Sequence, residues 1–149
     1  MKKFKFSLQK LLDIREAKEA KIKNELMKFL GIQNRERMLQ DELRSKIKRY
    51  ESEYSEKLKK GVYSAEEAMF LMRYVDTARN AIAGAQKRIE ALQPTVDEIR
   101  GRLVVASREK KIVEKLKERK FKEYMDEFNR NMAKENDDTN QKLYQRNLR

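Results

Sequence analysis

The side chains that could do chemistry in this sequence are carboxylates, amines and guanidinium groups, since its 149 residues include no His and no Cys. Without those two residues, the common nucleophile–base pairs and thiolate metal sites cannot be assembled. The 25 Asp and Glu residues are expected on exposed helical faces, where no pocket shifts their pKa or excludes water. The sequence therefore predicts that the protein is not an enzyme and has no catalytic residue, no metal and no cofactor.

The positive charges are unevenly distributed, and this pattern indicates binding. Residues 1–23 carry eight Lys or Arg against three Asp or Glu, and residues 100–123 carry ten against four. Residues 24–99 are almost balanced, with fourteen against thirteen. A charged stretch is usually only a solvated face, but two basic segments that converge in space favour a docking surface for an acidic partner.

The elements that must bring these segments together are long helices. Only four Gly and one Pro interrupt a chain in which 42% of the residues are charged. Alternating steps of four and three trace a second-helix seam of Leu71, Val75, Ala78, Ile82, Ala85, Ile89, Leu92, Val96, Ile99, Leu103, Ala106, Lys110 and Val113. This strict period predicts a left-handed coiled coil, seen as an elongated rod with a thin core. Lys110, the one polar member, either snorkels out of the seam or marks where it opens for a partner.

The first half of the chain supplies the partner helix, with a poorer seam. Its positions are Leu8, Leu12, Arg15, Glu19, Ile22, Leu26, Phe29, Gln33, Glu36, Gln40, Leu43, Ile47, Tyr50 and Tyr54, of which nine of fourteen are apolar. Ile32 and Leu39 lie one position off this seam, which suggests that the contact face wanders. Gly31 weakens the helix there by about 1 kcal/mol relative to Ala. A slightly irregular coiled coil is favoured over a designed hinge.

A short turn joins the two helices and makes them antiparallel neighbours. Gly61 suits the left-handed position after a helix, and Ser64 with Glu67 can form a capping box. We expect one antiparallel coiled-coil domain over residues 1–149, with a first helix over about 7–59 capped by Ser7, a turn over about 60–63, a second helix over about 64–135 kinked near the solvent-facing Pro94, and a frayed Asn-rich tail over about 136–149.

Aromatic residues gather near the turn. They are Tyr50, Tyr54, Tyr63, Phe70 and Tyr74. Some must pack across the seam, but a two-helix coil leaves part of any large ring exposed, and exposed aromatics are favoured interface anchors. Core packing and partner binding are about equally expected for this group.

Several further properties are expected to be absent. No apolar run approaches the ~20 residues that span a bilayer, so we expect no direct membrane insertion. The basic N-terminus lacks the apolar stretch of a signal peptide. A chain without Cys fits a reducing cytoplasm. Exposed seam residues on an overhanging second helix could support homo-oligomers.

Three motifs together resemble the flagellar export protein FliJ family, soluble components of the flagellar type III export apparatus. They are Phe4-x-Phe6-x-Leu8-x-x-Leu11-Leu12-x-x-Arg15, Gly61-Val62-Tyr63-Ser64 preceded by Tyr50-x-x-x-Tyr54, and Arg108-Glu109-Lys110-Lys111 followed by Glu114-x-Leu116-x-x-Arg119. The resemblance covers nearly the whole chain, and its specificity lies in the conjunction of length, order and spacing.

The resemblance implies an all-α antiparallel hairpin similar to the gamma-subunit stalk of rotary ATP synthases. It further implies that the free end enters the flagellar export ATPase ring and promotes its assembly, and that the protein contacts the export gate membrane protein and export chaperones. By motif, the ATPase-docking residues would be Phe4, Leu8, Leu12, Arg15, Arg108, Lys110, Lys111 and Arg119. The export-gate surface would be Tyr50, Tyr54 and Tyr74. The location implied is cytoplasmic, at the inner membrane through the export apparatus.

Two other functions stay open at this stage. A basic coiled coil could bind nucleic acid through phosphates, which would give a steep salt dependence. Against this, the two basic segments also hold seven acidic residues and few exposed aromatics, so we expect no nucleic-acid partner. A passive spacer between larger assemblies would need no charge difference between its ends.

Overall fold

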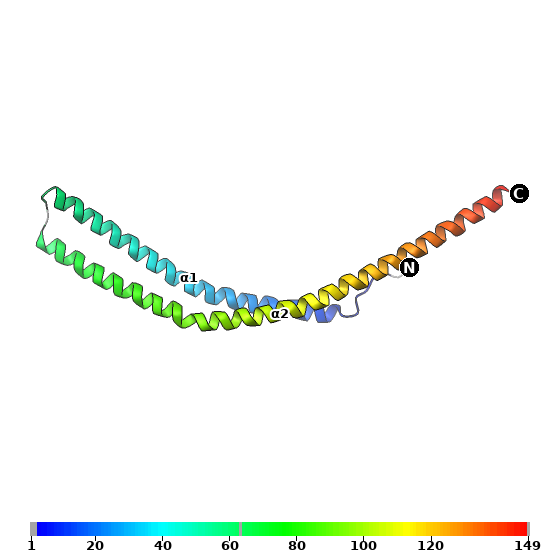
Figure 1. The fold of residues 1–149 in the computed structure, drawn as a ribbon, viewed down its shortest axis with the longest axis horizontal. Coiled ribbons are helices and arrows are strands. Elements are labelled where there is room, and N and C mark those ends of the chain that lie inside the picture. Colours follow the sequence, from blue (N-terminus) through cyan, green and yellow to red (C-terminus); the bar gives the residue numbers. More distant parts are fainter. Residues whose placement is uncertain (1–2, 63, 149) are drawn as a thin grey trace. The chain divides into compact units, whose positions relative to one another are not determined.

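The computed structural model describes residues 3–62 and 64–148. Two helices, α1 (Gln9–Lys59) and α2 (Ala65–Asn147), account for almost all of them, and the described residues contain no strand (Figure 1). The two helices pack against each other as a helical hairpin, which confirms the predicted fold class. Met1, Lys2 and Arg149, at the predicted ends, and Tyr63, in the predicted turn and aromatic group, lie outside the described residues.

Contacts divide the chain into two compact units, which we describe separately. The loop unit comprises Ile22–Arg102, and the terminal unit comprises Met1–Lys21 with Leu103–Arg149. Each unit contains a stretch of α1 beside a stretch of α2. The expectation of one domain over the whole chain stays a prediction.

The core of the loop unit follows the seam predicted for the second helix. Val75, Ala78, Ala85, Ile89, Val96 and Ile99 are all buried. Ala85 and Val96 retain no exposed surface, which is what the inward positions of a regular heptad require. α2 continues through Pro94, whose ring is exposed on the outer face. The absence of an amide hydrogen at Pro94 therefore does not end the helix.

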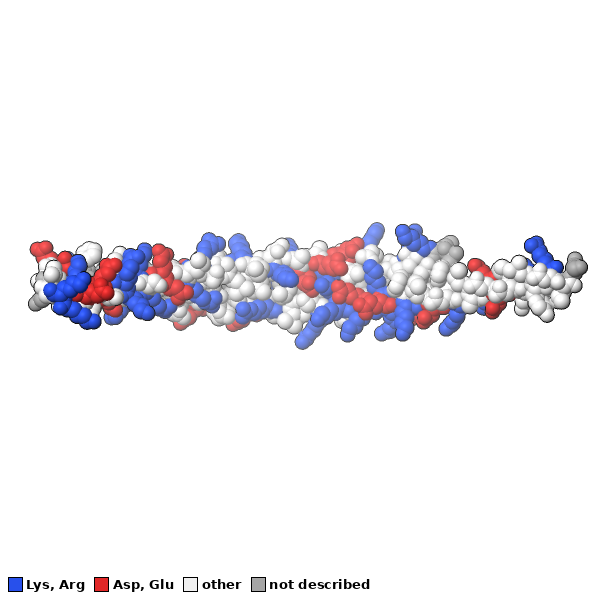
Figure 2. Space-filling model, turned by 90° about the horizontal axis from the view of Figure 1, so that it is seen from above, with Lys and Arg blue, Asp and Glu red and all other residues white. Residues whose placement is uncertain are grey.

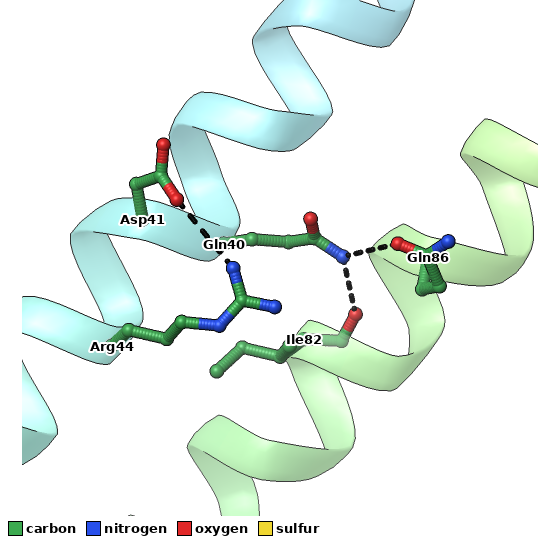
Figure 3. Close-up of polar contacts among 5 residues, drawn as sticks. All are labelled: Gln40, Asp41, Arg44, Ile82 and Gln86. Carbon is green, nitrogen blue, oxygen red and sulfur yellow. Dashed lines mark hydrogen bonds and ion pairs between the residues drawn. The ribbon is translucent and has the colours of Figure 1, made fainter.

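Two buried glutamines explain why the seam of the first helix looked poor. Gln33 and Gln40 are 1% and 4% exposed. The amide of Gln40 donates to the carbonyl oxygen of Ile82 at 3.2 Å and to Oε1 of Gln86 at 3.1 Å (Figure 3). The contact face thus includes the glutamines and does not turn away from them, so the expected wandering is wrong. Leu39, one position off the seam, is 37% exposed.

The same arrangement occurs one heptad away. Gln33 donates to the carbonyl oxygen of Ile89 and to Oε1 of Gln93, each at 3.1 Å. Both amides therefore span the two helices and satisfy acceptors on α2. Buried polar groups are tolerated when they are hydrogen-bonded in this way.

The turn has the predicted chemistry at both helix ends. Gly61 has φ of +71°, and the amide of Val62 donates to the carbonyl of Lys57 while that of Gly61 donates to Leu58. This pair of bonds is the Schellman arrangement that closes a helix. On the other side, the amide of Glu67 donates to Oγ of Ser64 at 3.1 Å, which caps α2.

Both predicted outer ends of the helices shift in the terminal unit. α1 begins at Gln9, where the carbonyl of Leu8 accepts the first helical bond from Leu12, so Ser7 lies in the preceding turn. α2 stays helical to Asn147, past the boundary expected near 135. Asn and Asp lower helix propensity only mildly, and neither Gly nor Pro follows Gly101 to break the helix.

Candidate functional site

The terminal unit contains every residue predicted to dock the ATPase. Its two basic helical stretches are neighbours, as bonds from Arg15, Lys18 and Lys110 to the opposite helix show. The predicted apolar members differ in exposure, since Leu12 is 4% exposed in the core and Leu8 is 39% exposed. Convergence of the two basic segments, on which the docking interpretation depended, is thus present in the fold.

Lys110 joins the two helices and does not mark a place where the seam opens. Its Nζ donates to Oε1 of Glu19 on α1 at 3.0 Å and lies 3.7 Å from Glu114 one turn along α2. The hydrogen bond to Glu19 raises the pKa of Lys110, so the ammonium form is favoured. Glu19 and Lys110 occupy seam positions on opposite helices, and each satisfies the other. The structure therefore gives Lys110 a role in pairing the helices.

Arg15 is also engaged within the molecule. Its guanidinium donates to the backbone carbonyl of Glu109 at 2.6 Å, while the carboxylate of Glu109 pairs with Lys18 at 3.3 Å. Of the predicted docking cations, Arg108, Lys111 and Arg119 have exposed side chains. These three are the ones accessible to a partner.

Phe4 lies in an aromatic cluster that the sequence did not reveal. Its ring is 5.3 Å from that of Phe121, edge on, and 5.5 Å from that of Tyr124. Tyr124 in turn stacks with Phe128. These contacts attach the non-helical residues 3–6 to α2. Heptad spacing could not indicate them, because a non-helical segment has no helical period.

In the loop unit, the predicted export-gate tyrosines line an open groove beside the turn. The rings of Tyr50 on α1 and Tyr74 on α2 meet edge to face at 5.0 Å. The groove is lined by Tyr50, Glu53, Tyr54, Lys57, Glu66, Glu67, Phe70, Leu71 and Tyr74. Phe70, which was not among the predicted gate residues, is 72% exposed and is the most accessible ring there. Tyr50, Tyr54 and Tyr74 are each half-buried, so they serve both packing and groove.

Several charged side chains of the loop unit are paired across the helices. Arg88 donates through two nitrogens to the two carboxylate oxygens of Glu36, each at 3.0 Å. This hydrogen bonding lowers the pKa of Glu36 and raises that of Arg88. Figure 2 shows acidic and basic side chains side by side over the loop end of the hairpin.

Two searches of the described residues found nothing. In residues 3–62 and 64–148, no group of three or more His, Cys, Asp or Glu is placed to hold a metal ion. Over the same residues, neither helix has a stretch long and apolar enough to cross a membrane.

The chain matches the sequence model of a known protein family. The sequence model of a family described as "Flagellar FliJ protein" matches residues 4–149, which is essentially the whole chain. Searches of curated proteins and of solved structures gave no match.

Proposed function

We propose a function from the premise that this chain belongs to the flagellar FliJ protein family and is therefore a component of the flagellar export apparatus. In this proposal the protein is not a catalyst. Its terminal unit docks in the ring of the flagellar export ATPase and promotes ring assembly and activity. Its loop unit contacts the export gate membrane protein, and the chain also meets export chaperones, all at the cytoplasmic face of the inner membrane.

The observation that carries the proposal is the convergence of the two basic segments in the terminal unit. In the terminal unit, residues 1–21 and 103–123 together carry fifteen Lys or Arg and seven Asp or Glu, and they contribute neighbouring stretches of α1 and α2. Arg108, Lys111 and Arg119 remain exposed after the internal pairs have formed. A surface of this kind attracts an acidic partner and increases its rate of association.

The gate contact is supported by a different surface. Phe70 and the half-buried tyrosines give the loop-unit groove an apolar part. The charged residues that line it are Glu53, Glu66, Glu67 and Lys57. Exposed aromatic side chains beside polar rims are common anchors in protein interfaces.

The test is ATP hydrolysis by the export ATPase of the same organism, measured with and without this protein at two ionic strengths. We expect the wild-type protein to stimulate hydrolysis, and more strongly at low salt because surface charges are screened at high salt. The triple variant Arg108→Glu/Lys111→Glu/Arg119→Glu should lose most of the stimulation. Lys110 is left unchanged, since its substitution by Glu would place two carboxylates against each other at Glu19.

A matched control changes the same charge elsewhere. The triple variant Lys48→Glu/Arg73→Glu/Lys87→Glu alters three exposed cations of the loop unit and should stimulate hydrolysis like the wild type. Circular dichroism confirms that both variants keep their helicity. Equal stimulation by the two triple variants, or none by the wild type, contradicts the proposed docking.

A further inference from the structure

The terminal unit has two unlike sides, and the ion pair between Lys18 and Glu109 identifies one of them. This pair joins α1 to α2 at 3.3 Å on the flank of the seam. Residues three, four or seven positions from each partner share its side of the helix. Among them, the apolar residues outside the seam are Leu11 and Ile14 on α1 and Val105, Ile112 and Leu116 on α2. We call these five residues the side ridge.

The side ridge is apolar and accessible. Ile14, Val105 and Ile112 are 64%, 52% and 65% exposed, and Leu11 and Leu116 are half-buried between them and the seam. Single exposed aliphatic residues are ordinary, but five on one side, contributed by both helices, mark an interaction surface. Nothing in the heptad seam requires them, because all five lie outside it.

Basic residues border the side ridge, and the one carboxylate among them, that of Glu109, is already paired. Lys18 and Lys21 on α1 and Arg119 on α2 lie on this side, and Lys10, Arg108 and Lys115 lie at its outer edge. The only acidic side chain between them, Glu109, binds Lys18 through its carboxylate and Arg15 through its carbonyl.

The opposite side of the terminal unit has the reverse character. It carries four acidic residues, Asp13, Glu16, Glu114 and Glu118, with Lys111 among them. Glu114 marks this side, since it lies one turn from Lys110 and contacts its ammonium group at 3.7 Å. The net positive charge of the unit is thus concentrated around the side ridge, and Lys111 lies on the other side.

We propose that the terminal unit contacts the ATPase through the side ridge. The ridge binds an amphipathic helix of the ATPase whose apolar stripe is bordered by Asp and Glu. The inference rests on the proposed function and specifies the contact. Two neighbouring helices with aliphatic residues on one flank form a shallow valley into which a third helix packs its own apolar stripe. Carboxylates at the edges of that helix would meet Lys18, Lys21 and Arg119.

The basic residues around the side ridge favour an acidic helix as the binding partner over a second copy of the chain. Two copies joined through the side ridge would bring basic borders together, because a two-fold contact uses the same patch on both partners. Like charges brought together in this way disfavour the contact. An acidic helix gains from the same borders.

Paired substitutions on the two sides test the proposal. Ile14→Ser/Ile112→Ser removes two exposed side-ridge residues, and Val104→Ser removes a 48% exposed aliphatic residue of the opposite side. For charge, Arg119→Glu is compared with Lys87→Glu, which changes an exposed cation of the loop unit. We expect the two side-ridge variants to bind the purified export ATPase about tenfold more weakly, the size of effect that truncating interface anchors has. The two control variants, Val104→Ser and Lys87→Glu, should bind like the wild type.

Photocross-linking supplies the second measurement. A p-benzoylphenylalanine at position 14 or 112 should cross-link to an acidic amphipathic helix of the ATPase, and the same group at position 104 should not. If the wild type binds the ATPase and all four variants bind equally, the side ridge is not the contact although the docking proposal stands. If the wild type fails to bind, the proposed function itself is wrong. A dimer that Ile14→Ser/Ile112→Ser converts to a monomer, measured by light scattering, would overturn the proposal in favour of self-association.

Discussion

At the scale of single residues, the polar positions of the seam work by pairing across the helices. Glu19 binds Lys110 in the terminal unit, and Glu36 binds Arg88 in the loop unit. Glu19 and Lys110 both occupy seam positions, whereas Arg88 lies beside the seam and binds Glu36, which is a seam residue of α1. Because the partners come from opposite helices, each pair also ties the helices at one relative position.

The pKa of Glu36 makes the stability of the loop unit depend on pH. Arg88 lowers this pKa below 4.5, so the folded state binds the proton less readily than the unfolded state. The contribution is therefore present above about pH 4.5 and is lost as the pH falls through the lowered pKa. We expect the thermal midpoint of the wild type to exceed that of Glu36→Gln at neutral pH, and the difference to shrink in acid.

Circular dichroism melting of both proteins between about pH 3 and pH 7 measures this difference. A difference that stays constant with pH would mean that Glu36 stabilises the fold by packing alone.

At the scale of elements, glycine is favourable in the turn and unfavourable in the middle of a helix. Gly61 has a positive φ and closes α1, whereas Gly31 lies inside α1, where an added Cβ would meet nothing within 4 Å. Gly61→Ala should lower the free energy of unfolding by about 1–2 kcal/mol, because an L side chain is strained in the left-handed region. Gly31→Ala should raise it by about 1 kcal/mol, because Ala is the better helix former.

Urea unfolding followed by circular dichroism compares the two variants. Destabilisation by both would show that Gly31 is needed for a close approach that the contacts around it do not indicate.

The helices themselves could be predicted from the sequence. Apolar residues at a 3.5-residue period and the residues of the turn can be recognised from their sequence neighbours alone. Val75 through Val113 and the pair Gly61 and Ser64 are examples. The heptad register placed Gln33 and Gln40 in the seam, but their hydrogen bonds could not be predicted, since these depend on acceptors such as Ile82 and Gln86 on the opposite helix. The side ridge was missed for a similar reason, since it exists only once α1 and α2 are side by side.

At the scale of the whole molecule, the two glutamine networks limit which helices can pair with α1. Replacing Gln33 and Gln40 by Leu removes two buried amides, and their side-chain partners on α2 keep other hydrogen bonds, because Gln86 also donates to Glu90 and Gln93 to Asp97. The seam would then be more apolar. We expect Gln33→Leu/Gln40→Leu to raise the free energy of unfolding by about 1 kcal/mol or more.

The same double variant should lose pairing specificity. An apolar seam accepts many partners, so we expect a concentration-dependent increase in oligomers, measured by light scattering together with thermal melting. If the variant melts at a higher temperature and keeps the oligomeric state of the wild type, the glutamines do not determine which helix pairs with α1.

The tight turn at Gly61 has a consequence for the order in which the chain folds. Cross-helix contacts span ten residues for Lys57 and Glu67 but ninety-four for Arg15 and Glu109. Closing a short loop costs less entropy than closing a long one, so we expect pairing to begin at the turn and to proceed toward the chain ends. A ribosome must release most of the second half of the chain before the terminal unit can pair. The surface with which we propose the protein meets its partner is thus the last to be completed during synthesis.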